Sequence, residues 1–401
     1  MRHSPTPRNR MPRRGLAAVT GLLTLAVSVC AGPTASAHAA DPSAGPSTAL
    51  YLPRPTGTHP VGTTSLYLKD ISRPDPWVPE ATARELMVSL WYPARPRGER
   101  RAQYMTPEES KLYLEREGLT DLPPDLLSTT RTNAFGDAKP VGRRHSLPLV
   151  VLSPGFIQNR ATLTALAEDL ASHGYVVAGI EHTYESAAAS FPDGRVATCV
   201  ACEVDHLPGF WDKLGATRAA DVSFVLDELT GAHPKWRGAR LIDPSRIAMA
   251  GHSAGGASAI LAMLADPRVR AGIDMDGQIH VPIPDSGLSR PFMFLGQAVH
   301  GPGGPENSWE QNWQHLTGWK RWLVVTGTVH SSFTDLAVLA EQVGIDLGDD
   351  LPATRALQIT RGYTRAFFDL HLRHRPQPLL DRPSTRYPEV KFCTVETTTC
   401  A

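Results

Sequence analysis

The chain has 401 residues, a length that suits one large α/β domain with insertions and would also allow two domains. Its 40 Lys and Arg residues are balanced by 40 Asp and Glu residues, so it lacks the basic excess on which nucleic-acid binding depends. No stretch is long and apolar enough to form a typical membrane-spanning helix.

The first 39 residues predict a signal peptide. Small residues at 35–39 resemble a cleavage site after the apolar run 16–30, with cleavage expected after Ala37 or Ala39. Before the run stand five arginines: Arg2, Arg8, Arg10, Arg13 and Arg14. We therefore expect a secreted, extracellular protein, exported by the Sec route or, given Arg13-Arg14, by the twin-arginine (Tat) route.

Removal of the signal changes the charge. Five arginines and no acidic residue are lost, so 35 basic and 40 acidic side chains remain, for a net charge of −5. A mildly acidic protein is a poor partner for nucleic acid and for anionic membranes. Residues 40–63 are rich in Pro, Gly, Ser and Thr and predict a flexible leader, and residues 64–401 are expected to form the folded domain.

Apolar, β-rich runs alternate with helical patterns from residue 86 onward. Strands are predicted at 86–92 (stopped by Pro93), 149–152, 175–180, 246–250, 271–275, 292–295 and 322–325. Helices are predicted at 161–172, 216–229, 257–265 and 334–342. Nearly continuous apolar strands separated by helices indicate an α/β fold with a mostly parallel central sheet that helices cover on both faces.

Three stretches interrupt this alternation and are interpreted as insertions: 95–146, 183–215 and 298–319. Insertions in such folds lie over the carboxyl edge of the sheet, where ligands bind. The last one carries Trp309, Trp313 and Trp319. These side chains would either line an apolar acyl pocket or pack the insertion against the core.

The cysteines predict disulfide bonds. Cys30 lies in the apolar run of the signal, and Val29 before it is too bulky for a lipoprotein signal. The other four are Cys199, Cys202, Cys393 and Cys400. Four cysteines allow three pairings, of which the nearest-neighbour one closes two short loops. A redox pair or half a zinc site at 199–202 would need a thioredoxin-like context or a second ligand pair, and neither is evident.

A candidate nucleophile stands in Gly251-His252-Ser253-Ala254-Gly255, which matches G-x-S-x-G. A serine hydroxyl is a poor nucleophile unless it is exposed beside a base, and a sharp turn between a strand and a helix achieves this. The predicted strand before Ser253 and the predicted helix after it supply that context. We therefore expect Ser253 to be the nucleophile of an α/β-hydrolase fold.

An acid and a base should follow the nucleophile in that order. Asp274 and Asp276 both stand at the end of the next strand and would point to the same side, so spacing alone leaves both open. His330 follows the last strong strand through a flexible segment, where the base should lie. Three other histidines are rivals without that context: His280, His300 and His315. The side chain of His252 is expected to point away from Ser253.

Two backbone N–H groups should stabilise the oxyanion. One belongs to Ala254, directly after the nucleophile. The other is expected from the loop after an earlier strand, Ser153-Pro154-Gly155-Phe156. Because Pro154 has no N–H group, we expect Phe156 to be this donor.

Taken together, these residues resemble the platelet-activating-factor acetylhydrolase family, its plasma and type II intracellular enzymes and bacterial relatives. The likeness spans about residues 64 to 375 and rests on five segments: Ser153–Phe156, Leu170–Val177 with Glu181-His182, Gly251–Gly256, Gly272–Asp276 and Val329–Asp335. It implies a triad of Ser253, Asp276 and His330. The chain departs from the family at Pro154, where a His is usual, and in the insertion that carries Cys199 and Cys202.

The resemblance implies a secreted serine hydrolase of carboxylic esters that works through an acyl-enzyme, without metal or organic cofactor. Its partner would be a small-molecule or lipid ester, such as a short-chain acyl ester or an acetylated or oxidised phospholipid, with transient contact to lipid surfaces left open. The same triad could instead cleave amides, polyesters or lactones. A third hypothesis is a non-catalytic binding protein that has kept the elbow, but the intact Ser, Asp and His disfavour it.

Overall fold

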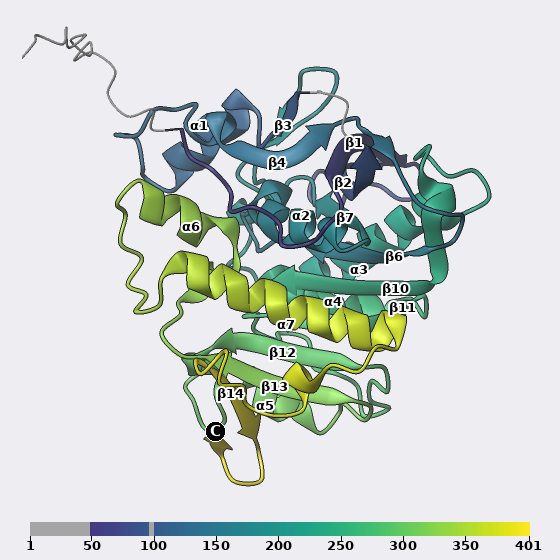
Figure 1. Cartoon of the computed structure of the whole chain (residues 1–401). Coiled ribbons are helices and arrows are strands. Elements are labelled where there is room, and N and C mark those ends of the chain that lie inside the picture. Colours follow the sequence, from purple (N-terminus) through teal and green to yellow (C-terminus); the bar gives the residue numbers. More distant parts are fainter. Residues whose placement is uncertain (1–48, 96–99) are drawn as a thin grey trace, which may run out of the picture. The chain divides into compact units, whose positions relative to one another are not determined.

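A sheet of 13 strands runs through the computed structural model, which describes residues 49–95 and 100–401 (Figure 1). The strand order is β15-β14-β13-β12-β11-β10-β6-β7-β2-β1-β4-β3, and β5 pairs with β2. The six central strands, from β7 to β13 in this order, are parallel to one another. Strands β2 and β14 pair antiparallel at the two ends of this block. The predicted signal, residues 1–39, lies outside the described residues.

The strands have the following bounds: β1 Val61–Asp70, β2 Arg84–Arg95, β3 Arg101–Gln103, β4 Arg131–Gly136, β5 Lys139–Pro140, β6 Leu147–Ser153, β7 Val176–Glu181, β8 Ala189–Ser190, β9 Val196–Ala197, β10 Ile242–His252, β11 Val269–Met275, β12 Phe292–Gln297, β13 Lys320–Val325, β14 Val390–Thr394 and β15 Thr399–Cys400. Strands β8 and β9 form a separate two-stranded sheet.

The α-helices are α1 Pro107–Arg116, α2 Thr164–Ser172, α3 Phe210–Thr230, α4 Ala254–Ala265, α5 Ser308–Trp313, α6 Asp335–Gln342 and α7 Ala353–Arg373. Short 3-10 helices are η1 Leu127–Thr129, η2 Arg160–Leu163, η3 Ala201–Glu203, η4 Ala239–Leu241, η5 Ala298–His300, η6 His330–Phe333 and η7 Pro378–Leu380. Among the described residues, no helix combines the length and the apolar character needed to cross a membrane.

The apolar strands divide their side chains between two cores because successive residues of a strand point to opposite faces. In β6, Leu149 and Val151 join the core formed with α3 and α4, whereas Val150 and Leu152 join the core formed with α2 and α7. Helix α7 crosses the front of the sheet in Figure 1, with α3 and α4 behind it. The α/β-hydrolase arrangement expected from the sequence, a mostly parallel sheet between helices, is confirmed.

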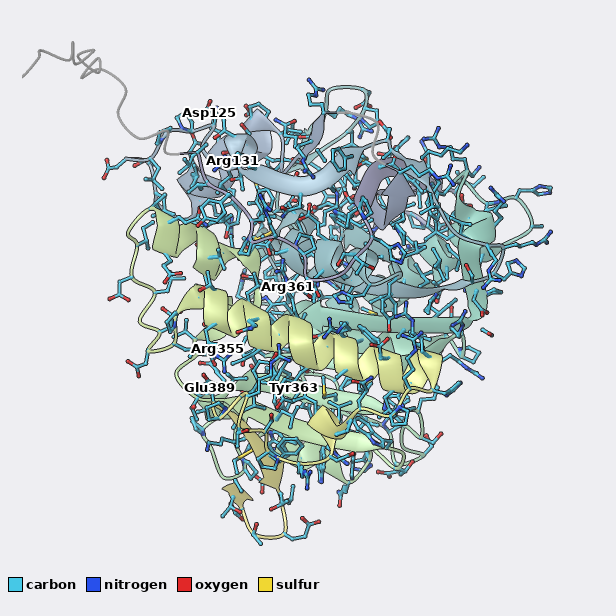
Figure 2. The ribbon with its side chains drawn as sticks, viewed as in Figure 1. Asp125, Arg131, Arg355, Arg361, Tyr363 and Glu389 are labelled. Carbon is cyan, nitrogen blue, oxygen red and sulfur yellow. A yellow bond between two sulfur atoms is a disulfide. The ribbon has the colours of Figure 1, made fainter. Side chains whose placement is uncertain are left out.

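Helix α7 also ties the two ends of the described chain to the core. Arg355 forms a two-point ion pair with Glu389 just before β14, at 2.9 Å for both N–O contacts (Figure 2). Arg361, one and a half turns further along the helix, donates to the carbonyls of Pro53 and Arg54. Sequence analysis did not predict this helix, although its buried residues recur with helical spacing.

The structure corrects the predicted leader and the predicted end of β2. Leu50 and Leu52 are buried, and β1 begins at Val61, so the expected boundary at residue 64 falls inside a strand. Apolar residues scattered among Pro, Gly and Thr are enough to anchor this segment. Strand β2 continues through Pro93 to Arg95. The proline lies two residues from the end of the strand, and its carbonyl still accepts from the N–H of Val141 at 2.8 Å.

The three stretches predicted as insertions contain short elements of their own. Residues 95–146 hold α1 and β3 to β5, residues 183–215 hold β8 and β9, and residues 298–319 hold α5. Trp309 on α5 is fully buried and stacks on Phe294 with ring centroids 4.5 Å apart. Trp313 packs against Trp322, and Trp319 packs on Phe367 and His371. The tryptophans therefore pack the insertion against the core, the second of the two alternatives.

Candidate active site

Ser253 stands at a sharp turn between β10 and α4. Its backbone has φ 55° and ψ −125°, a conformation that a residue with a side chain adopts only under strain. The turn depends on two glycines. A Cβ atom on Gly251 would lie 2.1 Å from the backbone of Gly255, and one on Gly255 would lie 2.0 Å from the carbonyl oxygen of Ser153. This strand–turn–helix has the geometry expected of a nucleophile elbow.

Asp276 and His330 meet beside the elbow. Asp276 follows β11 and is buried, whereas His330 opens η6 after β13 and keeps 49% of its side chain exposed. The Nδ1 atom of His330 lies 2.6 Å from Oδ2 of Asp276. Because an ionised carboxylate only accepts hydrogen bonds, Nδ1 carries the proton and Nε2 is left as the acceptor.

The charge on Asp276 is stabilised by several donors. Burial by itself would raise the pKa of Asp276, but the hydrogen bond from His330 and the nearby His300 lower it below its usual value. The N–H of Gln297 donates to Oδ1 at 2.6 Å, and its Nε2 donates to Oδ2 at 2.9 Å. Gln297 ends β12, and sequence analysis missed it. Its place at the carboxyl end of the neighbouring parallel strand is the signal that could have indicated it.

Asp274, the competing acid, has another environment. Its Oδ1 accepts from the N–H of Gly277 at 2.8 Å, and its Oδ2 lies buried without a hydrogen-bond partner among the described residues. Burial, helped by the charge of Asp276, raises the pKa of Asp274 well above its usual value. A buried, neutral carboxyl group with no histidine beside it suits a structural role.

The rival histidines are dispersed. His315 lies near Asp285, and His280 stacks on Trp211 with ring centroids 4.2 Å apart. His300 is buried, and its Nε2 lies 3.5 Å from Oδ1 of Asp276. His300 thus contacts the acid on the side opposite to His330, a contact that its position in a predicted insertion did not suggest.

His252 contacts the segment that carries His330. Its ring packs on that of His330 with centroids 4.4 Å apart, and its Nε2 lies 2.8 Å from the carbonyl oxygen of His330. Burial, with the charge of His330, lowers the pKa of His252 to about 3. A neutral ring can donate from Nε2 to that carbonyl and so fix the loop that carries the base. That the side chain of His252 points away from Ser253 stays a prediction; its contact with His330 was not foreseen.

The loop after β6 packs directly against Ser253. A Cβ atom on Gly155 would lie 3.3 Å from Cβ of Ser253. In the part of the chain that the structure describes, the N–H of Phe156 takes part in no hydrogen bond. The N–H of Ala254 opens α4, where a helix has no internal acceptor for it. Both predicted oxyanion donors are thus unused and flank the elbow.

A small hollow of about 20 Å³ adjoins Ala254. Its walls come from α3, α4 and the segment 279–281, and include Trp211, Leu261 and His280. Phe156 packs on Phe210 and Trp211, with ring centroids 5.3 and 5.8 Å apart. Sequence analysis did not single out Phe210 and Trp211, because nothing in the sequence shows that the start of α3 reaches the elbow. Within the described residues, no cluster of His, Cys, Asp or Glu could hold a metal ion.

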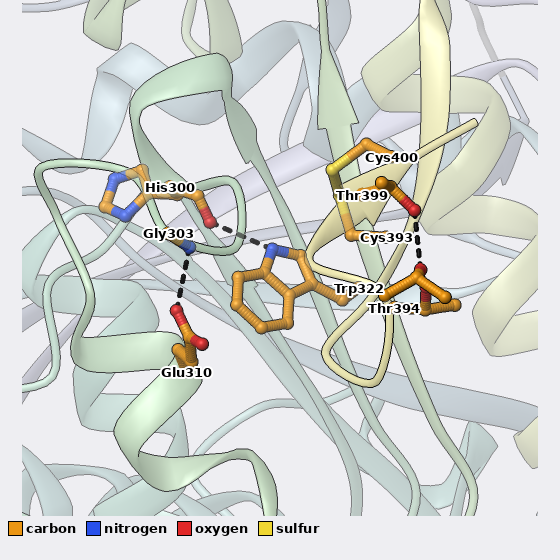
Figure 3. The surroundings of a disulfide bond; sticks show 9 residues. His300, Gly303, Glu310, Trp322, Cys393, Thr394, Thr399 and Cys400 are labelled. Carbon is orange, nitrogen blue, oxygen red and sulfur yellow. Dashed lines mark hydrogen bonds between the residues drawn. A yellow bond between two sulfur atoms is a disulfide. The ribbon is translucent and has the colours of Figure 1, made fainter.

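Both predicted disulfide bonds are present, Cys199–Cys202 and Cys393–Cys400. The first packs with Phe210 and Ala254 in one apolar cluster. The second joins β14 to β15 (Figure 3). Near it, Trp322 donates its Nε1–H to the carbonyl of His300 at 3.0 Å (Figure 3).

The fold, the elbow after β10 and an acid–histidine pair on later loops of the same sheet edge together define the α/β-hydrolase class.

Within that class, the chain belongs to the family described as "Platelet-activating factor acetylhydrolase, isoform II", whose model matches residues 44–196 and 237–373. A probable 1-alkyl-2-acetylglycerophosphocholine esterase of Arthroderma benhamiae is 28% identical over 86% of this chain and 94% of its own. Platelet-activating factor acetylhydrolase of Cavia porcellus is 24% identical over 71% of this chain and 69% of its own.

A solved structure, a ferulic acid esterase from Streptomyces cinnamoneus, is similar with a TM-score of 0.76 and 44% identity, covering 86% of this chain and all of that one. The curated relatives and the solved structure agree on one reaction class, and this chain is accordingly a hydrolase of carboxylic esters.

Proposed function

We propose that the chain is a serine esterase that works through an acyl-enzyme, with Ser253 as nucleophile, His330 as base and Asp276 as the acid that orients the base. The observation that carries the proposal is the 2.6 Å contact between His330 and buried Asp276 beside the strained elbow of Ser253. An exposed imidazole on a buried carboxylate is the arrangement that activates a serine hydroxyl.

In the first half of the reaction, Nε2 of His330 takes the proton of Ser253 as Oγ attacks the ester carbonyl. The N–H groups of Phe156 and Ala254 stabilise the negative charge that forms on the carbonyl oxygen. His330 then gives its proton to the leaving alcohol. In the second half, water attacks the acyl-enzyme with His330 as base. The carboxylic acid product is released and Ser253 is free again. Throughout, Asp276 stays ionised and holds Nδ1.

The size of the hollow supports a short acyl group. The hollow beside Ala254 is small, about 20 Å³, and aromatic and aliphatic side chains form most of its walls. Acetyl esters, including acetylated phospholipids, are therefore the proposed substrates, in agreement with the names of the curated relatives.

A second candidate is an ester of an aromatic acid. The stacked rings of Trp211 and His280 offer a flat apolar surface next to Ala254, and the solved relative is named as a ferulic acid esterase. Amide, lactone and polyester cleavage would use the same triad, but no feature of the site favours them.

Secretion is part of the proposal. The arginine-rich and apolar segment before residue 40 supports export, and two disulfide bonds suit an oxidising compartment. Transient contact with lipid surfaces would accompany a phospholipid substrate. The test is expression of the full chain with an epitope tag at the C-terminus: the processed protein should appear in the medium with its new N-terminus near residue 38 or 40. An uncleaved intracellular protein would contradict secretion.

The mechanism is tested by covalent labelling. A fluorophosphonate should modify purified protein at one residue, Ser253, and peptide mass spectrometry should locate it there. Ser253→Ala should take up no label at an unchanged melting temperature. Label on another serine, or uptake by Ser253→Ala, would refute the assignment.

The substrate is tested with a panel at fixed enzyme concentration. It contains 1-alkyl-2-acetylglycerophosphocholine, p-nitrophenyl acetate and butyrate, methyl ferulate, an acetanilide, a lactone and a polyester film. We expect the acetyl esters to give the highest kcat/KM. A higher value for methyl ferulate would favour the second candidate, and activity on the anilide alone would contradict ester hydrolysis.

A further inference from the structure

A second Ser–His–Asp array lies behind the loop that carries Phe156. The Oγ atom of Ser153, at the end of β6, lies 2.9 Å from Nε2 of His182, which follows β7. The Nδ1 atom of His182 lies 2.8 Å from Oδ2 of Asp221 on α3. All three side chains are buried, with at most 1% of each residue exposed. No substrate can reach this serine, so the array has another role.

The directions of its hydrogen bonds are determined. Arg84 lies against Asp221 at 2.8 Å and lowers the pKa of that carboxyl, against the effect of its burial. Asp221 is thus an ionised acceptor, and Nδ1 of His182 must donate to it. Burial, with the charge of Arg218 nearby, lowers the pKa of His182, so its ring is neutral. Nε2 of His182 therefore accepts from the hydroxyl of Ser153.

Arg218 on α3 connects this array to the loop. Its Nη1 donates to the carbonyl of Pro154 at 2.6 Å and, more weakly, to Oγ of Ser153 at 3.3 Å. Its Nε donates to Oε2 of Glu185 at 2.7 Å. Since the hydroxyl proton of Ser153 goes to His182, its oxygen is free to accept from Arg218.

Glu185 holds the other side of the same loop. Its backbone carbonyl accepts from the N–H of Ile157 at 2.8 Å, and Ile157 has a positive φ of 73°. The ion pair of Arg218 with Glu185 thus fixes the chain at Pro154 and at Ile157, on either side of Phe156. The ring of Phe156 packs on Phe210 of the same helix α3.

We infer that the buried pair Arg218–Glu185, backed by Ser153, His182 and Asp221, is a brace that positions the N–H of Phe156 for the oxyanion. These are positioning residues, because the contacts that fix the loop end at Pro154 and Ile157 and none of them reaches the reacting atoms. The inference rests on the proposed function. Arg218 and Asp221 lie in residues 197–236, which the family model leaves unmatched, so family membership does not imply the brace.

The N–H of Phe156 needs precise positioning because it would form part of an oxyanion hole. An N–H group stabilises the transition state only when it points at the developing charge, and a shift of about 1 Å can lower the rate about a hundredfold. The N–H of Phe156 takes part in no hydrogen bond among the described residues, so its direction depends on its neighbours. Proline at 154 removes one donor from the loop, and Arg218 fixes the carbonyl of that same residue.

The test compares Arg218→Met, the double variant Arg218→Met/Glu185→Gln, and a matched control, Arg373→Met. Arg373 also joins an acid, Asp369, to two loop carbonyls, those of His173 and Gly174, but it does so at the amino end of β7, the opposite edge of the sheet. Each purified variant is measured for kcat, KM, melting temperature and labelling of Ser253.

We expect Arg218→Met to lower kcat on p-nitrophenyl acetate about 30- to 100-fold with KM within about twofold, since the transition state alone loses its donor. Arg373→Met should lower the melting temperature with kcat unchanged. In Arg218→Met the charge of Glu185 keeps only Trp77 at 2.9 Å and Arg84 at 3.5 Å, so the double variant, which removes that charge, should regain part of the melting temperature but not kcat. Recovery of both together, or an equal loss of kcat in Arg373→Met, would reduce Arg218 to a structural role and overturn the inference.

Failure of the brace and failure of the proposed function give different results. If Ser253 is not the nucleophile, Ser253→Ala retains activity whatever Arg218 does. If only the brace is wrong, Ser253→Ala is inactive while Arg218→Met keeps its kcat. Arg218→Lys tests an intermediate case. A single ammonium cannot reach both Glu185 and Pro154 as the guanidinium does, so its kcat should lie between those of wild type and Arg218→Met.

Discussion

Two Ser–His–Asp arrays stand at the same edge of the sheet, and they differ in exposure rather than in chemistry. His330 contacts Asp276 at 2.6 Å, and His182 contacts Asp221 at 2.8 Å. The first histidine is half exposed, whereas the second is 1% exposed. The contact between a histidine and a buried aspartate alone would therefore nominate two candidate centres in the described part of the chain.

The serines separate the two arrays. Ser253 sits at a strained turn that lifts it out of the sheet, while Ser153 ends a regular strand and is fully buried. Moreover, Ser153 is also held by Arg218, and Asp221 by Arg84. A set whose side chains are all buried and bound by neighbours suits a structural role. A set with an exposed histidine can be reached by a substrate. Access, created at Ser253 by backbone strain, thus separates the proposed nucleophile from the buried hydroxyl of Ser153.

The largest expected difference is between the serines. Ser253→Ala should lower kcat on p-nitrophenyl acetate by about five orders of magnitude, because no other group can form the acyl-enzyme. Ser153→Ala should lower it less than about tenfold, because only one of several contacts of the loop is lost. Steady-state kinetics on both variants measures this. If Ser153→Ala were as inactive as Ser253→Ala while still labelled at Ser253, access would not be the deciding property.

Substitution of the two aspartates should affect different properties of the protein, activity for Asp276 and stability for Asp221. Asp276→Asn should lower kcat about 10⁴-fold with little change in melting temperature, since an amide favours the wrong tautomer of His330. Asp221→Asn removes one of the two carboxylates that lie 2.8 Å from the buried Arg84, the other being Asp75, and should lower the free energy of unfolding by about 3 kcal/mol. Urea unfolding together with kcat separates the two losses. A stable and fully active Asp221→Asn would show that Arg84 does not depend on that charge.

Sequence analysis predicted the exposed array and missed the buried one, for a physical reason. The elbow is a local pattern, because strain, glycines and the nucleophile lie within five residues. Asp276 and His330 follow strands whose apolar runs are visible in the sequence. The brace joins β6, β7 and α3 through single contacts at long range, and no local pattern marks Arg218 as buried. The buried Leu50 escaped notice for the same reason, whereas the helical spacing of α7 is visible in the sequence and was overlooked.

The pH response should also separate the arrays. Activity should fall reversibly in acid, because His330 must be neutral to accept a proton. Stability depends instead on the buried rings: burial lowers the pKa of His252 to about 3 and lowers that of His182. The unfolded chain then binds more protons than the folded one below about pH 6.5, so the unfolding free energy decreases as pH falls.

The measurement is melting temperature against pH, with activity assayed before and after return to pH 7.5. His252 alone should account for about 2 kcal/mol of stability lost between pH 6.5 and 5. His252→Gln should flatten the decline, whereas a variant at the exposed His206, His206→Gln, should retain it. An unchanged slope in His252→Gln would mean that its ring titrates as freely in the folded protein as in the unfolded chain.

The smallest effects are expected from the two disulfide bonds. Cys199–Cys202 packs near the loop of Phe156, and Cys393–Cys400 lies near the loop of His300 (Figure 3). Both close short loops, so replacing either pair by serines should cost about 2 kcal/mol of unfolding free energy. Because the catalytic loops are fixed by other contacts, kcat should stay within about tenfold of wild type, which corresponds to 1.4 kcal/mol. A larger loss of kcat for the first pair alone, at full labelling of Ser253, would show that this disulfide shares the positioning of Phe156 with Arg218.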